Sequence, residues 1–348
     1  MSESVYVPGR TLSAGFYRDV VEPLVRGWPH AAGLLGEGSD VLGYDDETST
    51  DHDWGPRLQL FVNVADVDNV RQAVTAGLPD TYAGWPVVFG SDKNAPQHRV
   101  EVWSLGDWLV RQVSFDPRPG MTAVDWLAIL QQQVLGIVRG VVHADPDGEL
   151  ARLRTQLAWY PDDVWRWLIA SQWTKISQEQ AFAGRAAQTG DELGSRIIAV
   201  RLVRELMRLA FLFERTYWPY TKWFGTAFAE LSTAAALTPA LDAATTATTH
   251  AGREEGLVAA YELLAGRHNT LGLHPFCKAE IAPYFSRPFQ VIHCGPLVAA
   301  CVAAIEDPWL RGLRLVGSID QFTDSTDVLS RPRRLVAAYG DQHLSTRT

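Results

Sequence analysis

Apolar positions in the first third of the chain follow two different spacings. Residues 16–28 (FYRDVVEPLVRGW) repeat apolar side chains at the spacing of an amphipathic helix despite Pro23, and residues 67–76 do so behind Asp66, the expected N-cap. Four shorter apolar runs, bounded by glycine or polar residues, predict strands. These runs are residues 31–35, 58–62, 85–89 and 98–105. The mixture of both element types predicts an α/β or α+β domain.

The remainder of the chain carries helical periodicity and little strand alternation. The segments expected to be helices are residues 123–139, 162–182, 194–217, 226–235, 254–265 and 296–306. The Ala/Thr-rich stretch 233–251 is expected to form a mobile helix or a loop, and the tail after Arg331 to be partly disordered. A Pro/Gly-rich joint at residues 117–121 separates the two patterns and predicts two domains, residues 1–120 and an all-α domain over 121–348.

Composition and charge narrow the classes of function. Of 348 residues, 47% are hydrophobic and 20% charged, which is ordinary for a globular protein with a buried core. The formal charge is −9, whereas a protein that coats nucleic acid needs a basic surface. The most apolar helical segment, residues 197–213, contains three arginines and a glutamate, which a bilayer core would resist. Because the N-terminus also lacks a signal-peptide pattern, we expect a soluble cytoplasmic protein with no membrane and no nucleic-acid polymer as partner.

The most informative segment for chemistry runs from residue 36 to residue 62. Gly38-Ser39 is followed after eleven residues by Asp51-His52-Asp53 and then by an apolar strand. In an extended segment, residues two apart point the same way, so Asp51 and Asp53 should project together while His52 points into the packed interior. Two such carboxylates repel unless a divalent cation such as magnesium lies between them, and a glycine-serine turn offers N–H groups and a hydroxyl to a phosphate. The alternative is a solvated acidic turn with an aspartate N-cap.

A third carboxylate is needed to complete a two-metal site or to accept a proton from the acceptor. Glu101 is the candidate, because an acid is unexpected in the apolar run at residues 98–105. Alternation puts Arg99, Glu101 and Trp103 on one face of that strand and two valines on the other. The alternative is a surface strand with an Arg99–Glu101 ion pair.

The order Gly-Ser, spacer, Asp-x-Asp, strand and later acid resembles the DNA polymerase β-type nucleotidyltransferase superfamily. The stretch DHDWGPR with a long helical region after it is similar to a bacterial domain-of-unknown-function family within that superfamily. The resemblance implies an α+β fold, in which a nucleotidyltransferase-type mixed sheet with flanking helices precedes an all-α C-terminal domain. It also implies transfer of a nucleoside monophosphate from a nucleoside triphosphate with two magnesium ions, ATP being the expected donor and AMP the transferred group.

The same resemblance assigns roles to individual residues. Gly38 and Ser39 would hold phosphate, Asp51 and Asp53 would hold the metal ions, and Glu101 would be the third ligand or the general base. Two features depart from the pattern of the superfamily. Residues 54–57 (WGPR) intervene between the second aspartate and the strand, and the third acid is a glutamate where aspartate is commoner.

The helical region offers further candidates for binding the nucleotide. Lys222 lies among aromatic residues in the stretch 214–224 (ERTYWPYTKWF), so it could reach a triphosphate while a ring stacks on the base, or simply extend to water. Arg201 and Arg204 lie three residues apart on one helix face with Arg208, which could neutralise phosphates or be solvated beside acids such as Glu205. Three aspartates near the C-terminus either cap a helix or close over a cationic acceptor; they are Asp320, Asp324 and Asp327.

The sequence therefore predicts a magnesium-dependent nucleotidyltransferase. The expected reaction transfers AMP from ATP to a hydroxyl of a small-molecule acceptor and releases pyrophosphate. The negative net charge suits a cationic acceptor. Two alternatives remain open at this stage, adenylylation of a partner protein and a non-catalytic module that binds nucleotide or another protein. The oligomeric state, monomer or dimer, is also open.

Overall fold

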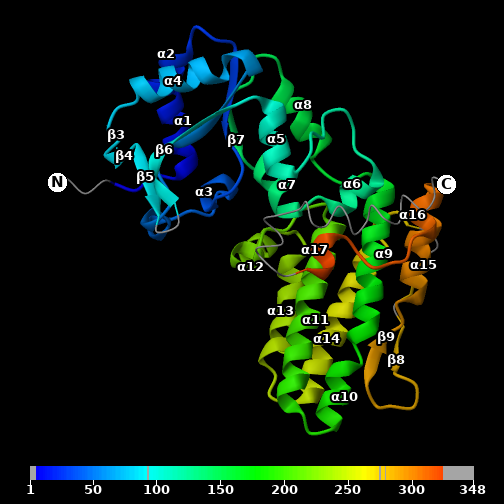
Figure 1. The fold of residues 1–348 in the computed structure, drawn as a ribbon. Helices are drawn as coiled ribbons and strands as arrows, with labels where there is room; N and C mark the ends of the chain where they lie inside the picture. Colours follow the sequence, from blue (N-terminus) through cyan, green and yellow to red (C-terminus); the bar gives the residue numbers. More distant parts are fainter. Residues whose placement is uncertain (1–4, 92–93, 274–275, 279, 324–348) are drawn as a thin grey trace. The chain divides into compact units, whose positions relative to one another are not determined.

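The protein divides into two compact units in the computed structural model, which describes residues 5–91, 94–273, 276–278 and 280–323 (Figure 1). The sheet unit comprises Met1–Met121 and Ile129–Ala158, and the helical unit comprises Thr122–Ala128 and Trp159–Thr348. The expected α+β class, with a sheet-bearing N-terminal part and a helical C-terminal part, is confirmed. The division differs from the expected boundary at residue 120 because residues 129–158 return to the sheet unit, where they supply a strand.

A five-stranded mixed sheet, in the order β5-β6-β2-β1-β7, forms the sheet unit. Its strands are β1 (His30–Leu34), β2 (Arg57–Val62), β5 (Val88–Ser91), β6 (Asn94–Trp103) and β7 (Val141–Ala144). β1 is antiparallel to β2 and β7, whereas β2 and β6 are parallel. The run 85–89 is not one strand as expected, because β4 (Trp85–Pro86) turns back to pair with β3 (Thr81–Tyr82) before β5 begins.

Alternation along the parallel strands separates two faces of the sheet. Leu58 and Leu60 of β2 and Val100 and Val102 of β6 are buried in one core cluster. Helices α1 (Gly9–Phe16), α2 (Glu22–Val25) and α4 (Val67–Gly77) supply further members of that cluster, together with the π-helical turn Tyr17–Val21. The intervening positions, which include Arg99 and Glu101, therefore lie on the opposite face, as the sequence predicts.

The remaining helices of the sheet unit are short. They are α3 (Ser39–Leu42), α5 (Leu105–Val113), α7 (Gln131–Val138), α8 (Glu149–Gln156) and two 3-10 turns, Glu47–Asp51 and Val64–Asp66. The single helix expected over residues 16–28 is instead three consecutive helical pieces that begin at Gly9, with Pro23 in the first turn of α2, where its missing N–H costs little. Asp66 stands at the N-cap position of α4, but its side chain accepts no capping hydrogen bond.

Long helices dominate the helical unit and lie alongside one another in Figure 1. They are α9 (Asp162–Glu179), α11 (Glu192–Phe213), α13 (Ala234–Thr246) and α14 (His250–His268). Shorter elements are α6 (Ala123–Ala128), α10 (Phe182–Gln188), α12 (Thr221–Ala229), β8 (Ile281–Pro283), β9 (Gln290–Ile292), α15 (Gly295–Ala303), α16 (Pro308–Gly312) and α17 (Ile319–Phe322). The Ala/Thr-rich stretch thus forms a helix, and the expected helix 123–139 is two helices, α6 and α7, in different units. The tail after Arg331, Asp324 and Asp327 lie outside the described residues.

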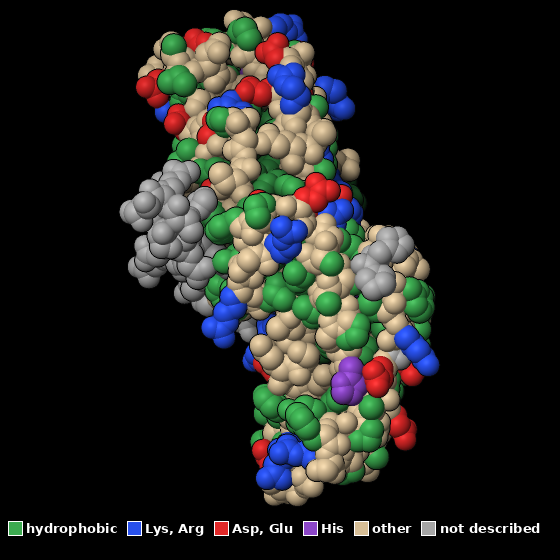
Figure 2. Space-filling model, turned by 90° about the vertical axis from the view of Figure 1, so that its right-hand side faces the viewer, with side chains coloured by type: hydrophobic (Ala, Val, Ile, Leu, Met, Phe, Trp, Pro, Cys, Tyr) green, Lys and Arg blue, Asp and Glu red, His purple; other side chains and the backbone are tan. Residues whose placement is uncertain are grey.

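The charged residues of α11 include a buried group that is paired with α9. Among the residues described, no helix has the length and apolarity needed to span a membrane. On the face drawn in Figure 2, apolar side chains are interspersed with charged and polar ones. Glu205 of α11 is 3% exposed and pairs with Lys175 of α9 at 3.1 Å and with Arg208 at 3.2 Å. Gln172 donates a further hydrogen bond to the Glu205 carboxylate, so this buried group is satisfied by three partners.

Replacement of this carboxylate tests how much the helical unit depends on it. We expect Glu205→Gln to lower the free energy of unfolding by about 3 kcal/mol, because Lys175 and Arg208 would remain buried without an acid. Burial raises the pKa of the Glu205 carboxyl, but Arg208 and Lys175 lower it more, so the pKa lies below its ordinary value. The stability from this group is therefore present above the ordinary glutamate pKa and is lost as the pH falls through the lowered pKa.

Denaturant unfolding over a series of acidic pH values measures both effects. Glu205→Gln should remove this part of the acid dependence, whereas Glu255→Gln on the exposed side of α14 should leave it as in the wild type. An unchanged acid dependence in Glu205→Gln would contradict the assignment.

Candidate functional site

The sheet topology brings the three predicted catalytic segments to one edge of the sheet. The chain leaves β1 at Leu34 and reaches Gly38-Ser39, and it passes Asp51-His52-Asp53 before it enters β2 at Arg57. Because β1 and β2 are antiparallel, the end of β1 and the start of β2 lie at the same edge. The parallel register of β6 pairs Arg99 with Arg57 and Glu101 with Gln59, close to that edge.

Gly38 has a backbone conformation that favours glycine. Its φ of 136° lies in the left-handed region, and it precedes Ser39, the first residue of the four-residue helix α3. A Cβ atom on Gly38 would lie 2.2 Å from both Arg57 Nη2 and Asp40 Oδ1. The glycine of the predicted Gly-Ser turn is therefore required by its backbone angle and by the ion pair packed against it.

The Arg57–Asp40 ion pair fixes this turn, and sequence reasoning missed it. Arg57 Nε donates to Asp40 Oδ2 at 2.8 Å, and Nη2 donates to Asp40 Oδ1 and to the Glu37 carbonyl, both at 2.6 Å. The side chains are 15% and 4% exposed. Burial lowers the pKa of the Arg57 guanidinium, but Asp40, with the nearby charges of Glu101 and Glu37, more than offsets it and raises the pKa. The only sequence signals were an arginine that ends the WGPR insertion and an aspartate directly after Gly-Ser.

Further contacts hold the turn from behind. Leu35 N donates to the buried Gln59 Oε1 at 2.8 Å, and Gly36 N donates to the Gly136 carbonyl at 3.0 Å. Arg10 Nη2 donates to the Val41 carbonyl at 2.7 Å. The segment between β1 and α3 is thus held by β2 and α7, and α3 itself is held by α1.

The segment that carries Asp51 and Asp53 is not extended as expected. Asp51 ends the 3-10 turn Glu47–Asp51, which starts at the reciprocal Asp46–Ser49 capping box, and Asp53 has a φ of 50°. The prediction that His52 points into the interior is wrong, because its side chain is 64% exposed and its Nδ1 lies 2.6 Å from Asp51 Oδ1. Both aspartates are accessible, with side-chain exposures of 63% for Asp51 and 39% for Asp53.

Each predicted acid has a cationic or hydrogen-bonding partner. Asp53 Oδ1 accepts a hydrogen bond from Arg99 Nη2 at 3.3 Å. Glu101 Oε2 accepts from Trp103 Nε1 at 3.2 Å and from Arg111 Nη1 at 3.4 Å, so the alternative Arg99–Glu101 pair is not formed. Within the described residues, no group of three His, Cys, Asp or Glu side chains converges in the way a metal ion requires. Glu101 lies on the same sheet with partners of its own, and the assignment of Asp51, Asp53 and Glu101 to metal ions stays a prediction.

The candidates of the helical unit have partners within that unit. Arg201 Nε lies 2.6 Å from Glu179 Oε2, and Lys222 Nζ lies 4.9 Å from the centre of the Trp223 ring. Arg208 is buried against Glu205 and does not share a solvated face with Arg201. Arg204 is half-buried. The role of Arg201, Arg204 and Lys222 in binding nucleotide stays a prediction.

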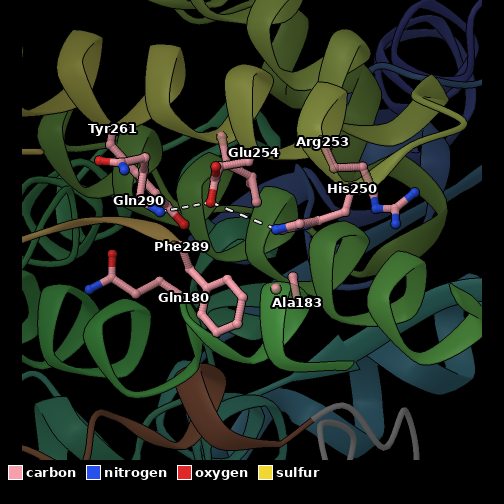
Figure 3. Close-up of a pocket in the computed structure, with 10 residues that line it drawn as sticks. Gln180, Ala183, His250, Arg253, Glu254, Tyr261, Phe289 and Gln290 are labelled. Atoms are coloured by element: carbon pink, nitrogen blue, oxygen red, sulfur yellow. Dashed lines mark hydrogen bonds and ion pairs between the residues drawn. The ribbon is translucent and has the colours of Figure 1, made fainter. Parts of the chain in front are cut away.

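A small pocket of the helical unit is formed by residues that sequence reasoning did not select (Figure 3). Glu254 Oε1 accepts a hydrogen bond from Gln290 N at 2.7 Å and lies 3.7 Å from His250 Nε2. Arg253 is buried nearby but is held by Glu192 through two hydrogen bonds of 2.7 and 2.8 Å. These polar groups are engaged in joining α14 to β9 and α11, which indicates a structural role.

Comparisons with known proteins cover the chain only in part. The profile of the family described as Domain of unknown function (DUF4037) matches residues 126–224. The chain is similar to that family in this segment, which contains β7 and the helices from α7 to α11 and excludes the Gly-Ser turn and the Asp51–Asp53 segment. A solved structure of a nucleotidyltransferase-like protein from Exiguobacterium sibiricum is 12% identical, covers 74% of this chain and 77% of its own, and has a TM-score of 0.31. No curated protein matches the chain.

Substitution of Gly38 tests the turn directly. We expect Gly38→Ala to lower the free energy of unfolding of the sheet unit by about 1–3 kcal/mol, from backbone strain and displacement of the Arg57–Asp40 pair. Thermal or denaturant unfolding measures this. Gly27→Ala is the matched control in the same unit, because a Cβ there meets nothing within 4 Å. Equal stability of the two variants would contradict the close packing around Gly38.

The ion pair itself can be dissected with a double-mutant cycle. Arg57→Met should destabilise the protein by about 3–5 kcal/mol, because Asp40 would remain buried and charged without its partner. Addition of Asp40→Asn should recover part of that loss, since the second change removes the uncompensated charge. Denaturant unfolding of the wild type, both single variants and the double variant gives the coupling. A loss within about 0.5 kcal/mol for Arg57→Met would show that the pair contributes no more than a surface contact.

Proposed function

We propose that this chain is a magnesium-dependent nucleotidyltransferase that transfers AMP from ATP to a hydroxyl of a small-molecule acceptor and releases pyrophosphate. The proposal rests on one observation. Two accessible carboxylates, those of Asp51 and Asp53, lie at the same edge of the sheet as the Gly38-Ser39 turn. An enzyme of this kind needs an anion-binding turn and a carboxylate pair within reach of one triphosphate. The motif order that resembles the nucleotidyltransferase superfamily supports the same conclusion.

The donor groups fit magnesium. This ion prefers oxygen ligands, and it usually keeps several waters while one or two carboxylates and the substrate phosphates complete its shell. Asp51 and Asp53 would supply the protein ligands for the two ions, and their exposure lets hydrated ions reach them. When bound, magnesium would neutralise the triphosphate and lower the pKa of the acceptor hydroxyl.

The protein groups then have separate tasks. The backbone of Gly38 and the hydroxyl of Ser39 would hold the phosphate tail, so that the acceptor oxygen attacks the α-phosphorus in line with the leaving pyrophosphate. Glu101 would accept the hydroxyl proton at a carboxylate oxygen or serve as a third ligand. Because the transferred group needs little covalent help, most of the rate increase would come from positioning and charge neutralisation.

Paired asparagine substitutions test the proposal. Asp51→Asn and Asp53→Asn should each reduce pyrophosphate release from ATP and magnesium, in the presence of a panel of hydroxyl acceptors that includes amino sugars, by at least about 100-fold. The chain offers a matched control in its second Asp-x-Asp sequence, Asp66 and Asp68, which lies at the start of α4. Asp66→Asn/Asp68→Asn should keep the wild-type rate.

Retention of wild-type turnover by Asp51→Asn/Asp53→Asn would remove this proposal. A mass increase of one nucleotide on a co-purified protein, without turnover of small acceptors, would instead identify adenylylation of a partner. Nucleotide binding in calorimetry that is independent of metal, with no turnover, would identify a non-catalytic module.

A further inference from the structure

We propose that Arg99 is a cationic latch on Asp53, which opposes metal binding until a nucleotide arrives and then turns to the triphosphate. The inference rests on the proposed function, because it assigns Asp53 to the metal. It adds a new property, namely that metal and nucleotide reinforce each other's binding through one arginine. Three observations carry it, and they concern the geometry of Arg99, its unused hydrogen-bonding capacity and the charges around it.

The Arg99–Asp53 contact has the geometry of an exchangeable pair. Its single distance of 3.3 Å is long for a charge-assisted hydrogen bond, which is typically about 2.7–2.9 Å. Arg57, its direct neighbour in the sheet register, holds Asp40 with two bonds of 2.6 and 2.8 Å. Arg57 of β2 and Arg99 of β6 thus lie side by side. Arg57 binds its acid through two short hydrogen bonds, whereas Arg99 contacts its acid through one long hydrogen bond. Asp53 is also 39% exposed whereas Asp40 is 4% exposed, so a divalent ion can reach Asp53 more readily than Asp40.

Arg99 also has an N–H group that takes part in no hydrogen bond among the described residues. Its side chain is only 18% exposed, and its buried Nε has no hydrogen-bond partner among the residues described. The guanidinium carbon lies 5.9 Å from the centre of the Phe89 ring, and Phe89 also packs against Gly55, next to the Asp53 segment. The aromatic ring therefore lies beside the guanidinium, at the outer limit of a cation–π contact of about 6 Å. A planar fork of N–H groups held in this way suits phosphate oxygens.

The charge balance explains why the two ligands would cooperate. In the described residues, Asp40 neutralises Arg57, Asp53 neutralises Arg99, and Arg111 pairs with Glu101. If a metal ion binds Asp53, Arg99 becomes a largely buried cation without its counterion, and this raises the free energy of the metal-bound state. An incoming triphosphate supplies the missing negative charge. Each ligand thus removes the penalty that opposes the other, which is a coupling between two binding events.

Binding measurements on Arg99→Gln test the latch, with Mn²⁺ as the metal probe followed by electron paramagnetic resonance and a non-hydrolysable ATP analogue followed by calorimetry. In the absence of nucleotide, Arg99→Gln should bind Mn²⁺ about three- to tenfold more tightly than the wild type, because the competing cation is gone. The same variant should bind the analogue with Mn²⁺ about tenfold more weakly. These opposite shifts are not expected from a merely structural arginine. Arg26→Gln, an equal charge change at the exposed C-cap of α2, should alter neither affinity.

The possible failures are distinguishable. Unchanged or weakened Mn²⁺ binding in Arg99→Gln, while Asp53→Asn abolishes it, would overturn the latch and leave the proposed function standing. Unchanged Mn²⁺ binding in Asp53→Asn would overturn the proposed function and the latch with it. If thermal unfolding shows that Arg99→Gln does not fold, Arg99→Lys replaces it; the shorter reach of its ammonium should loosen the latch and shift both affinities in the same directions by smaller factors.

Discussion

The buried ion pair between Arg57 and Asp40 is the constraint on which the rest of the candidate site depends. It ties the first residue of β2 to the turn that follows β1, and its arginine also holds the Glu37 carbonyl. Two charges of opposite sign are nearly removed from water, which is stable only when both are fully paired. The pair therefore fixes the relative position of a turn and a strand that are 17 residues apart in sequence. Gly38 is the backbone residue that makes room for it.

The sequence located the main elements where local periodicity is strong, although it misplaced several of their boundaries. Apolar runs located the central strands, and alternation in β6 correctly placed Val100 and Val102 in the core and Arg99 and Glu101 on the other face. The helical C-terminal part followed from its apolar spacing, whereas the composition of the Ala/Thr-rich stretch, which forms α13, fits either a mobile helix or a loop. β7 escaped detection because its four residues are all half-buried and give no clear alternation, and its pairing with β1 joins residues more than 100 apart.

Side-chain partners at the site could not be predicted in the same way. The extended conformation assumed for Asp51-His52-Asp53 neglected the capping box at Asp46 and Ser49, which starts a 3-10 turn, and the left-handed φ of Asp53. An Arg99–Glu101 ion pair on one strand face was the alternative to a catalytic role of Glu101. In the structure, Arg99 pairs with Asp53 of a preceding loop, and Glu101 pairs with Arg111 of α5. Only the tertiary structure brings these partners near.

The return of residues 129–158 to the sheet unit has a consequence for how the protein can be divided. The polypeptide changes unit three times, so a single cut in the Pro/Gly-rich joint does not yield an intact N-terminal fragment. A fragment that ends at residue 120 would lack β7 and expose the free backbone groups of β1 as a new sheet edge, the kind of surface that recruits other strands into aggregates. It would also lose Gly136, whose carbonyl anchors Gly36. The sheet unit is thus contiguous in space but interrupted along the chain.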